Sequence, residues 1–334
     1  MRYYNIPIFV PHEGCPFDCS FCNQRRITGM DTSITKEQIS EIIEEHLKTL
    51  PESGRYVEAA FFGGSFTGIS PEKQCEFLET AYKYVKNKKI DGIRLSTRPD
   101  YISEEILDRL ERYGVSAIEL GVQSMDDEVL KASARGHDAK TVERAVSLIK
   151  KYPFKLGLQM MTGLPGDTDE KAVMTARRII DLKPDFVRIY PTLVLSDTLL
   201  EGLYKNGEYT PQTISEAVNL CKKLLLMFRE NNIDVIRVAL VTTDEISDKG
   251  SVVAGPFHSA FRELVEGEIF YDQITAVLDK DSSVRTFCVN PRELSKAIGN
   301  GKVNLKKIKD KYGFDIEIKP MENIEKGKIK VWKE

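Results

Sequence analysis

The chain has 334 residues, of which 41% are hydrophobic and 30% are charged, a balance typical of globular proteins that excludes a fibrous or disordered chain. Its 48 lysines and arginines against 51 acidic residues give a net charge of −3, so only a local patch, and not overall basicity, could argue for nucleic-acid binding. Because the longest apolar stretch near the N-terminus, Ile6–Val10, is too short for a signal peptide or membrane span, we expect a cytoplasmic protein without membrane association whose six cysteines stay reduced.

Short β-branched runs alternate with longer amphipathic stretches over the first 240 residues. The predicted strands are Tyr3–Val10, Val57–Phe62, Gly92–Ser96, Ala117–Val122, Lys155–Met161, Phe186–Pro191 and Asp234–Val238. The predicted helices are Thr35–Leu50, Pro71–Lys86, Ser103–Tyr113, Asp126–Lys131, Ala139–Lys151, Thr168–Leu182 and Thr213–Asn231. This alternation predicts an α/β fold with a parallel sheet, either a partial (β/α) barrel or an open doubly wound sheet. In both, ligands bind in the loops that follow the carboxyl ends of the strands.

The alternation of strands and helices changes after residue 240. We divide the chain into a barrel over 1–240, a connecting helical segment over 241–282 and a small α+β domain over 283–334. The last domain reads as strand, helix, glycine-containing turn, helix, strand, strand. From Pro291 onward, 12 lysines and arginines stand against 7 acidic residues, so this tail carries a charge of +5.

Three cysteines follow the first strand. Cys15, Cys19 and Cys22 have the spacing C-x3-C-x2-C, close enough for three thiolates to hold one inorganic centre. Thiolates are the usual ligands of iron–sulfur clusters. A zinc ion with His12 or a distant cysteine as fourth ligand is the alternative.

Further polar motifs follow the other strands. Gly63-Gly64-Ser65 comes after the second, where paired glycines let the backbone approach a ligand. Gln123 follows the fourth strand and can both donate and accept hydrogen bonds, while Arg135 offers a two-pronged donor for a carboxylate.

The cysteine spacing resembles the signature of the radical S-adenosylmethionine (SAM) superfamily. Together with the segments STRPDY, ELGVQS, ARGH, QMMTGLPG and RIYPTLV, it resembles the radical SAM part of the Elongator catalytic subunit over roughly residues 5–240. The resemblance implies a partial (β/α)6 TIM-like barrel and a [4Fe-4S] cluster on Cys15, Cys19 and Cys22. It also implies that SAM bound to the fourth iron is cleaved reductively to a 5′-deoxyadenosyl radical, with flavodoxin or ferredoxin as electron donor.

The resemblance also implies SAM contacts. Phe21, the aromatic before the third cysteine, is expected against the adenine. The Gln and Arg spacing is similar to that of the coproporphyrinogen dehydrogenase branch, which implies that Gln123 binds the ribose and Arg135 the SAM carboxylate. Two positions depart from the family pattern, because Ser65 and Gln159 stand where it has acids. The remaining expected SAM contacts are Gly63, Gly64 and Thr97.

Residues for the substrate are expected near the same end of the barrel. His258 and Arg262 lie among aromatics in GPFHSAFRE, and with Tyr190 they are candidate catalytic residues. A capped helix whose aromatics face the core explains the same segment.

The tail resembles a KH module, in which a GXXG loop clamps a nucleic-acid backbone. The matching loop begins at Gly299 and Gly301, but Lys302 replaces the last glycine. Lys302, Lys306 and Lys307, followed by Lys309 and Lys311, could meet phosphates. An accessory domain with a solvated lysine face is the alternative.

We therefore predict a radical SAM enzyme that acts on RNA, with tRNA as the expected partner. Three alternatives remain: oxidation of a porphyrin-like or other small molecule, a sulfur-inserting or methyl-transferring relative, and a non-catalytic zinc and RNA-binding protein. Two differences from the Elongator enzyme stand out. That enzyme has a longer gap between its first two cluster cysteines, and nothing after Val238 resembles its acetyltransferase domain, so use of acetyl-CoA is not assumed.

Overall fold

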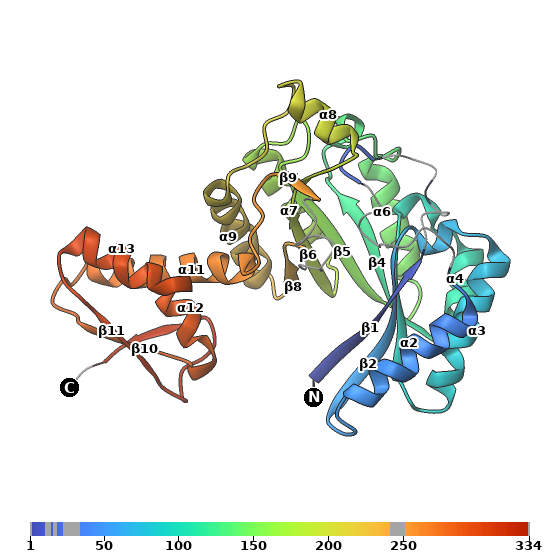
Figure 1. Cartoon of the computed structure of the whole chain (residues 1–334), viewed down its shortest axis with the longest axis horizontal. Helices are drawn as coiled ribbons and strands as arrows, with labels where there is room; N and C mark the ends of the chain where they lie inside the picture. The colour runs from blue at the N-terminus through green and yellow to red at the C-terminus, as the bar shows by residue number, and fades with distance from the viewer. Residues whose placement is uncertain (1, 11–14, 16–18, 23–33, 241–250, 333–334) are drawn as a thin grey trace.

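A computed structural model describes residues 2–10, 15, 19–22, 34–240 and 251–332. Within these residues the main sheet has seven parallel strands, arranged in space in chain order (Figure 1). They are β1 (Arg2–Val10), β2 (Arg55–Gly63), β3 (Gly92–Thr97), β4 (Val115–Gln123), β5 (Lys155–Thr162), β6 (Phe186–Pro191) and β8 (Asp234–Val238). The seven predicted strands are therefore confirmed.

The sheet curls into an open half-barrel. On a flat sheet β1 and β5 would lie about 19 Å apart, since neighbouring strands are about 4.8 Å apart. Yet the Lys155 ammonium on β5 lies 6.0 Å from the ring centre of Tyr3 on β1. Likewise, the Arg188 guanidinium on β6 lies 5.3 Å from the ring of Phe62 on β2. These contacts across the interior confirm the partial barrel and exclude the open doubly wound sheet.

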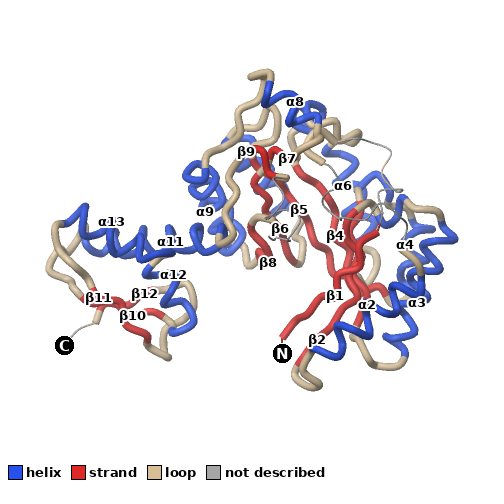
Figure 2. Tube along the Cα trace, viewed as in Figure 1, coloured by secondary structure: helices blue, strands red, loops and turns tan. Residues whose placement is uncertain are grey.

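Helices cover the outside of this half-barrel (Figure 2). They are α2 (Lys36–Thr49), α3 (Pro71–Lys86), α4 (Glu104–Arg112), α5 (Asp127–Ala132), α6 (Ala139–Ile149), α7 (Asp169–Asp181) and α9 (Ile214–Glu230). Side chains of Thr35, Ser103 and Thr213 accept amide hydrogen bonds at three of their N-termini, as expected for capping residues. Outward strand residues such as Ile118 and Leu120 are completely buried beneath the helices.

A small cap covers one end of the barrel. It consists of β7 (Val194–Leu195), paired antiparallel with β9 (Val252–Ala254), and of α8 (Leu199–Lys205). Sequence reasoning missed all three elements. The two strands are two and three residues long and far apart in the chain, so no local pattern reveals their pairing.

The C-terminal part confirms the predicted element order. It contains β10 (Thr286–Val289), α12 (Leu294–Ile298), α13 (Val303–Tyr312), β11 (Glu317–Pro320) and β12 (Ile329–Val331). Strand β10 is central, parallel to β11 and antiparallel to β12. Single-turn 3-10 helices occur at Phe66–Gly68, Pro99–Tyr101, Pro291–Glu293 and Asn300–Lys302.

One helix, α11 (Phe261–Leu278), joins the two parts. Phe261 and Val265 in its first half belong to the barrel core, whereas Phe270 and Ile274 in its second half belong to the C-terminal core. The helix is thus built into both cores. A search of the described residues for a helix long and apolar enough to cross a bilayer finds none.

Candidate functional site

The cysteine segment is fixed between two distant parts of the barrel. The Ser20 amide donates to the Ser133 carbonyl over 3.1 Å, and the Leu200 amide donates to the Ser20 carbonyl over 2.7 Å. A turn between Cys19 and Cys22 is closed by a 3.0 Å hydrogen bond. These bonds hold Cys19 and Cys22 next to the cap.

Two arginines lie beside Cys19. The Arg135 Nη1 is 3.3 Å from the Cys19 Sγ, and the Arg98 Nη1 is 3.9 Å from it. Both arginines are almost completely buried. Arg98 is held by two hydrogen bonds to Asp100, of 2.9 and 3.0 Å, and also donates to the Arg135 carbonyl. The arginines therefore place positive charge where thiolates are needed.

Burial and neighbouring charges act in opposite directions on the Cys15 thiol. Burial raises the pKa of the Cys15 thiol, while the Ser65 amide and the charges of Arg98 and Arg135 oppose that rise. Soft thiolate donors compensated by guanidinium groups fit an iron–sulfur cluster.

The described residues do not form a closed metal site. No three His, Cys, Asp or Glu side chains among them, Cys15, Cys19 and Cys22 included, lie close enough together to hold a metal ion. His12, the proposed fourth ligand of the zinc alternative, lies outside the described residues.

The loops after β2 and β3 are joined by hydroxyl groups. The Ser65 Oγ lies 2.8 Å from the Thr97 Oγ1, and it also accepts the Arg98 amide over 3.1 Å. Before Ser65, Gly63 has a φ of 102°, which a side chain would disfavour, and the Gly64 amide donates to Val10. The predicted SAM residues of these two loops therefore lie together next to Arg98.

Gln123, Arg135 and Gln159 also meet, as the sequence suggests. The Gln159 Nε2 lies 3.4 Å from the Gln123 Oε1, and the Arg135 Nη2 donates to the Gly121 carbonyl over 2.5 Å. Gln123 has a left-handed φ of 67° at an irregularity in the pairing of β4 with β5. A side chain at Gly121 would come within 3.1 Å of the Gln123 amide nitrogen. Glycine therefore makes room for these polar groups.

His137 completes the surroundings of Arg135. Burial and the charge of Arg135 lower the pKa of His137 to about 4, so the ring is neutral at pH 7. Its Nε2 can therefore accept the hydrogen bond that the Arg135 Nε donates over 3.3 Å. With Nη2 and Nε held in this way, Arg135 directs Nη1 toward Cys19.

Phe21 lies in an apolar cluster under the cap. This cluster contains Val194, Leu200 and Tyr209, with Phe21, Leu203 and Ala254 packed against them. The side chain before the third cysteine is thus held by β7, β9 and α8, and its contact with adenine remains a prediction.

The three candidate catalytic residues occupy two places. Tyr190 faces the barrel interior, where its hydroxyl accepts a 3.3 Å hydrogen bond from Arg188. His258 and Arg262 line a cavity of about 340 Å³ at the start of α11, whose lining does not include Tyr190. The His258 Nδ1 accepts the Ala260 amide, and Arg262 donates to the Ile236 carbonyl. No side chain caps α11, whose N-cap residue is Ala260, but Phe261 is buried in the core, as the alternative of core-facing aromatics expects.

The candidate RNA-binding residues surround the α12–α13 turn. Gly299 and Gly301 have φ values of 84° and 61°, and Lys302 is also left-handed, with φ 63°. Lys302 and Lys306 are exposed. The remaining lysines have carboxylate partners: Lys307 pairs with Glu268, Lys309 with Asp315 and Lys311 with Asp279.

The barrel interior holds a belt of buried charges that sequence reasoning missed. Arg94 is 2.7 Å from Glu58 and 2.9 Å from Glu119, and Arg188 donates to Glu119 over 2.9 Å. Each charge lies in the middle of a largely apolar strand, and the charges come from β2, β3, β4 and β6; only β2 carries a second charge, Arg55 at its start. The recurrence of an isolated charge on several neighbouring strands could have predicted the belt from the sequence. Arg98 was missed as well, although it stands within a quoted motif.

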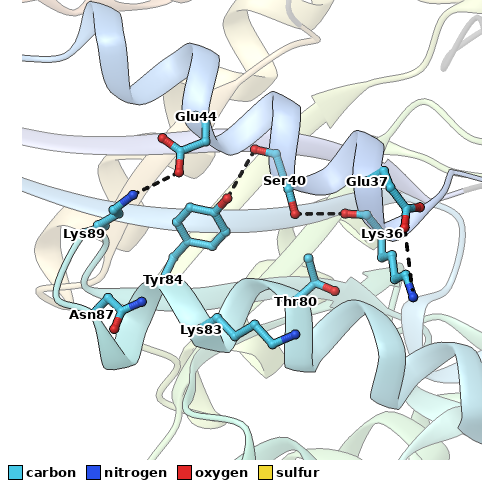
Figure 3. A pocket seen from close by; sticks show the side chains of 9 residues that line it. All are labelled: Lys36, Glu37, Ser40, Glu44, Thr80, Lys83, Tyr84, Asn87 and Lys89. Carbon is cyan, nitrogen blue, oxygen red and sulfur yellow. Dashed lines mark hydrogen bonds and ion pairs between the residues drawn. The ribbon is translucent and has the colours of Figure 1, made fainter.

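A further groove lies outside the barrel between α2 and α3 (Figure 3). It encloses about 620 Å³ and is lined by Lys36, Glu37, Ser40, Glu44, Thr80, Lys83, Tyr84, Asn87 and Lys89. An exposed ion pair of 3.0 Å between Lys89 and Glu44 crosses it. None of the cysteines or predicted SAM residues lines it, so it is not part of the site.

Comparison with known proteins identifies the family. The model of the radical SAM superfamily matches residues 9–179, and that of the radical SAM C-terminal domain matches residues 184–270. A tRNA uridine(34) acetyltransferase of Dehalococcoides mccartyi is 31% identical over 175 residues, which cover 46% of this chain and 38% of that protein. The chain thus spans well under half the length of this relative.

Two other comparisons cover more of the chain. An uncharacterised protein of Methanocaldococcus jannaschii is 29% identical over 72% of this chain and 71% of its own length. The structure of Elp3 from Methanocaldococcus infernus superposes with a TM-score of 0.63 at 21% identity, covering 94% of this chain and 68% of that one, which shows a shared fold. Since the superfamily model matches half of the sequence, the match supports an iron–sulfur cofactor rather than zinc, while the three cysteines as its ligands stay a prediction. The chain belongs to the radical SAM superfamily, whose enzymes use a [4Fe-4S] cluster and SAM.

Proposed function

We propose that this radical SAM enzyme acts on a base in RNA, most directly in tRNA. The observation that carries the proposal is the similarity of about half of the chain to proteins named for tRNA modification, including a second tRNA uridine(34) acetyltransferase that is 36% identical over 53% of the chain. The acetyl transfer in their name is not part of the proposal, because only about a third of each protein is matched. Action on tRNA would place the enzyme in the cytoplasm.

We propose a distinct role for each group of residues at the site. Cys15, Cys19 and Cys22 would hold the cluster, which together with SAM supplies a radical able to abstract a hydrogen atom. Arg98 and Arg135 offset the charge of the thiolates. An external reductant is needed, for which we propose flavodoxin or ferredoxin.

The predicted SAM contacts remain proposals that the geometry supports. Gln123 and Gln159 present amide groups to the barrel interior, and Arg135 points a nitrogen toward the cysteines. The apolar cluster around Phe21 would exclude water from this side. Gly63 leaves the backbone accessible to a ligand.

Substrate orientation is assigned to the interior of the barrel. Tyr190 is fixed by Arg188, which is itself held by Glu119, so its hydroxyl has a defined position. His258 and Arg262 would contribute only if the substrate extends to the cavity at the start of α11.

Isotope transfer tests the proposal. Enzyme reconstituted without oxygen is incubated with SAM, dithionite and tRNA deuterated at its bases, and 5′-deoxyadenosine is analysed by mass spectrometry. Deuterium in 5′-deoxyadenosine is the expected result. If 5′-deoxyadenosine forms but carries no label with any RNA, while a porphyrin-like molecule transfers label, RNA is not the substrate.

A further inference from the structure

The last strand of the chain carries an exposed basic and aromatic face. Lys330 lies in β12 (Ile329–Val331), and Lys328 and Trp332 flank the strand two positions before and after it. Side chains on a strand alternate between its two faces, and the Trp332 amide continues the pairing by donating to Thr286. The intervening residues Ile329 and Val331 pack against the C-terminal core. The lysines and the tryptophan therefore share the opposite face, which is turned toward solvent.

The pairing of the strands extends this face across the sheet. Cys288 on central β10 pairs with Lys330 on one side and Lys319 on the other, so the three residues form one row. The Trp332 amide donates to the Thr286 carbonyl in the next row. Helices α11 and α13 lie on the other side of the sheet (Figures 1 and 2). Cys288 in the middle of the row is buried, so the solvent-exposed parts of this face are its two edges, at Lys319 on β11 and at Lys330 and Trp332 along β12. We call Lys319, Lys328, Lys330 and Trp332 the sheet-face patch.

The tryptophan is unusual. It is the only tryptophan in the 334-residue sequence, and its side chain is 44% exposed. The Lys319 ammonium lies over the indole ring, 5.9 Å from its centre, so a lysine and the tryptophan lie close together on this face. Lysines alone would be explained by an edge strand that avoids pairing with another sheet, but this does not explain an exposed indole.

The charge of the patch is only weakly compensated. Lys319 pairs with Glu317 over 3.1 Å, but both side chains are largely exposed, so the pair is weak. Within the part of the chain that the structure describes, no carboxylate pairs with Lys328 or Lys330. This differs from helix α13, where three of the five candidate RNA-binding lysines have carboxylate partners.

We infer that the sheet-face patch binds single-stranded RNA, with bases stacking on Trp332 and phosphates contacting the lysines. Stacking on an aromatic side chain within a basic groove is how proteins hold single strands without reading sequence. The inference rests on the proposed function, because it adds a docking site for the RNA substrate. It moves the expected RNA contact of the small domain from the α12–α13 turn to the opposite side of the sheet.

The single tryptophan makes the inference directly measurable. The full chain is titrated with oligouridylate while tryptophan emission is recorded. Heparin, which has negative charge but no bases, and single-stranded DNA are compared. Saturable quenching by oligouridylate but not by heparin is expected, and raising the salt concentration should weaken it. Stronger quenching by single-stranded DNA than by oligouridylate would show that the patch binds DNA rather than RNA.

Variants separate the patch from the turn. With fluorescently labelled oligouridylate and anisotropy as the readout, Trp332→Ala should weaken binding roughly tenfold or more, whereas Trp332→Phe, which keeps a ring, should retain most of it. Lys330→Gln should reduce the salt dependence by about one phosphate contact. Lys309→Gln on α13 is the matched control and should change neither.

Two results would overturn the inference. One is RNA binding by anisotropy without any change in tryptophan emission, which would place the RNA elsewhere. The other is the absence of RNA binding altogether, as expected if the patch docks a protein. Neither result depends on radical chemistry, so deuterium transfer from tRNA would still support the proposed function by itself.

Discussion

The barrel and the small C-terminal domain use charged residues in opposite ways. In the barrel, Arg94, Glu119 and Arg188 are over nine-tenths buried and bind one another. In the small domain, Lys328 and Lys330 are exposed and no carboxylate described here pairs with them. A charge of the first kind fixes the scaffold, because removing its partner leaves it buried and uncompensated. A charge of the second kind contributes little to folding and remains available for a ligand.

The most severe loss is expected at the cysteines. Cys19→Ala should abolish cluster binding and SAM cleavage, since one of three thiolate ligands is gone. Cys288→Ala, which removes a buried thiol of the small domain, should leave iron binding intact. Iron content and visible absorbance after anaerobic reconstitution measure both. Full iron content in the Cys19 variant would contradict the ligand assignment.

The belt should dominate the stability of the barrel. Glu119→Gln leaves two buried guanidinium groups without their shared carboxylate and should lower the free energy of unfolding by about 3–5 kcal/mol. Glu105→Gln removes the exposed partner of Arg109 and should cost less than about 0.5 kcal/mol. Urea denaturation of both variants measures the two losses in the free energy of unfolding. Equal losses would remove the contrast between buried and exposed charges.

Acid should act on the barrel through His137. Burial and Arg135 lower its pKa from 6.5 to about 4, so its neutral form is favoured by folding. This contribution is complete above pH 6.5 and is lost as the pH falls to about 4, a change of about 3 kcal/mol. Denaturation as a function of pH should show a shallower acid loss for His137→Gln than for the unmodified chain.

Asp167 should give the opposite sign in the same range. Burial raises the pKa of Asp167 to about 6, so stability is lost as the pH rises from about 4 to 6. Asp167→Asn should therefore steepen the net acid loss that His137 causes. An identical pH profile for both variants would show that neither group titrates as described.

Arg98 should tune the cluster more than it stabilises the fold. Arg98→Gln removes a positive charge 3.9 Å from Cys19 and should lower the midpoint potential by roughly 40–60 mV, the equivalent of about 1 kcal/mol for one electron. Arg98→Lys should restore part of the shift. Arg109→Gln, on α4, serves as the control, and a redox titration followed by electron paramagnetic resonance compares the three. Equal potentials for the two glutamine variants would remove this role.

The weakest effect is expected at α13. Lys309→Gln breaks an ion pair with Asp315 whose side chains are 58% and 76% exposed. The free energy of unfolding should change by less than about 0.5 kcal/mol. A loss above about 1 kcal/mol in urea denaturation would mean that exposed charges in the small domain are structural after all.

Local patterns in the sequence predicted the regular parts of the fold. Alternation of strands and helices predicted all seven barrel strands, and the predicted helices Thr35–Leu50 and Ser103–Tyr113 begin at the residues that cap α2 and α4 in the structure. The pairing between segments that are far apart in the chain was not predicted. Strands β7 and β9 are too short to be recognised, and only the folded chain brings them together.

The site was predictable to the extent that motifs follow strands. Gln123, Arg135 and Gln159 meet because parallel strands bring their carboxyl ends to one edge. Arg98 could not be ranked above the many other arginines, because its importance comes from its distance to Cys19. The belt escaped notice because each charge alone looks like an isolated exception in its strand.

Helix α11 has a geometric consequence for any RNA held at the small sheet. Its 18 residues form a rod about 27 Å long that is embedded at one end in the barrel and at the other in the small domain. Such a rod fixes the distance between the two parts, because moving either end would disrupt the hydrophobic core in which it is buried. An RNA strand bound at Trp332 would then extend to the radical site only after a set number of nucleotides. The distance along the RNA, rather than its sequence, would therefore select the nucleotide that reacts.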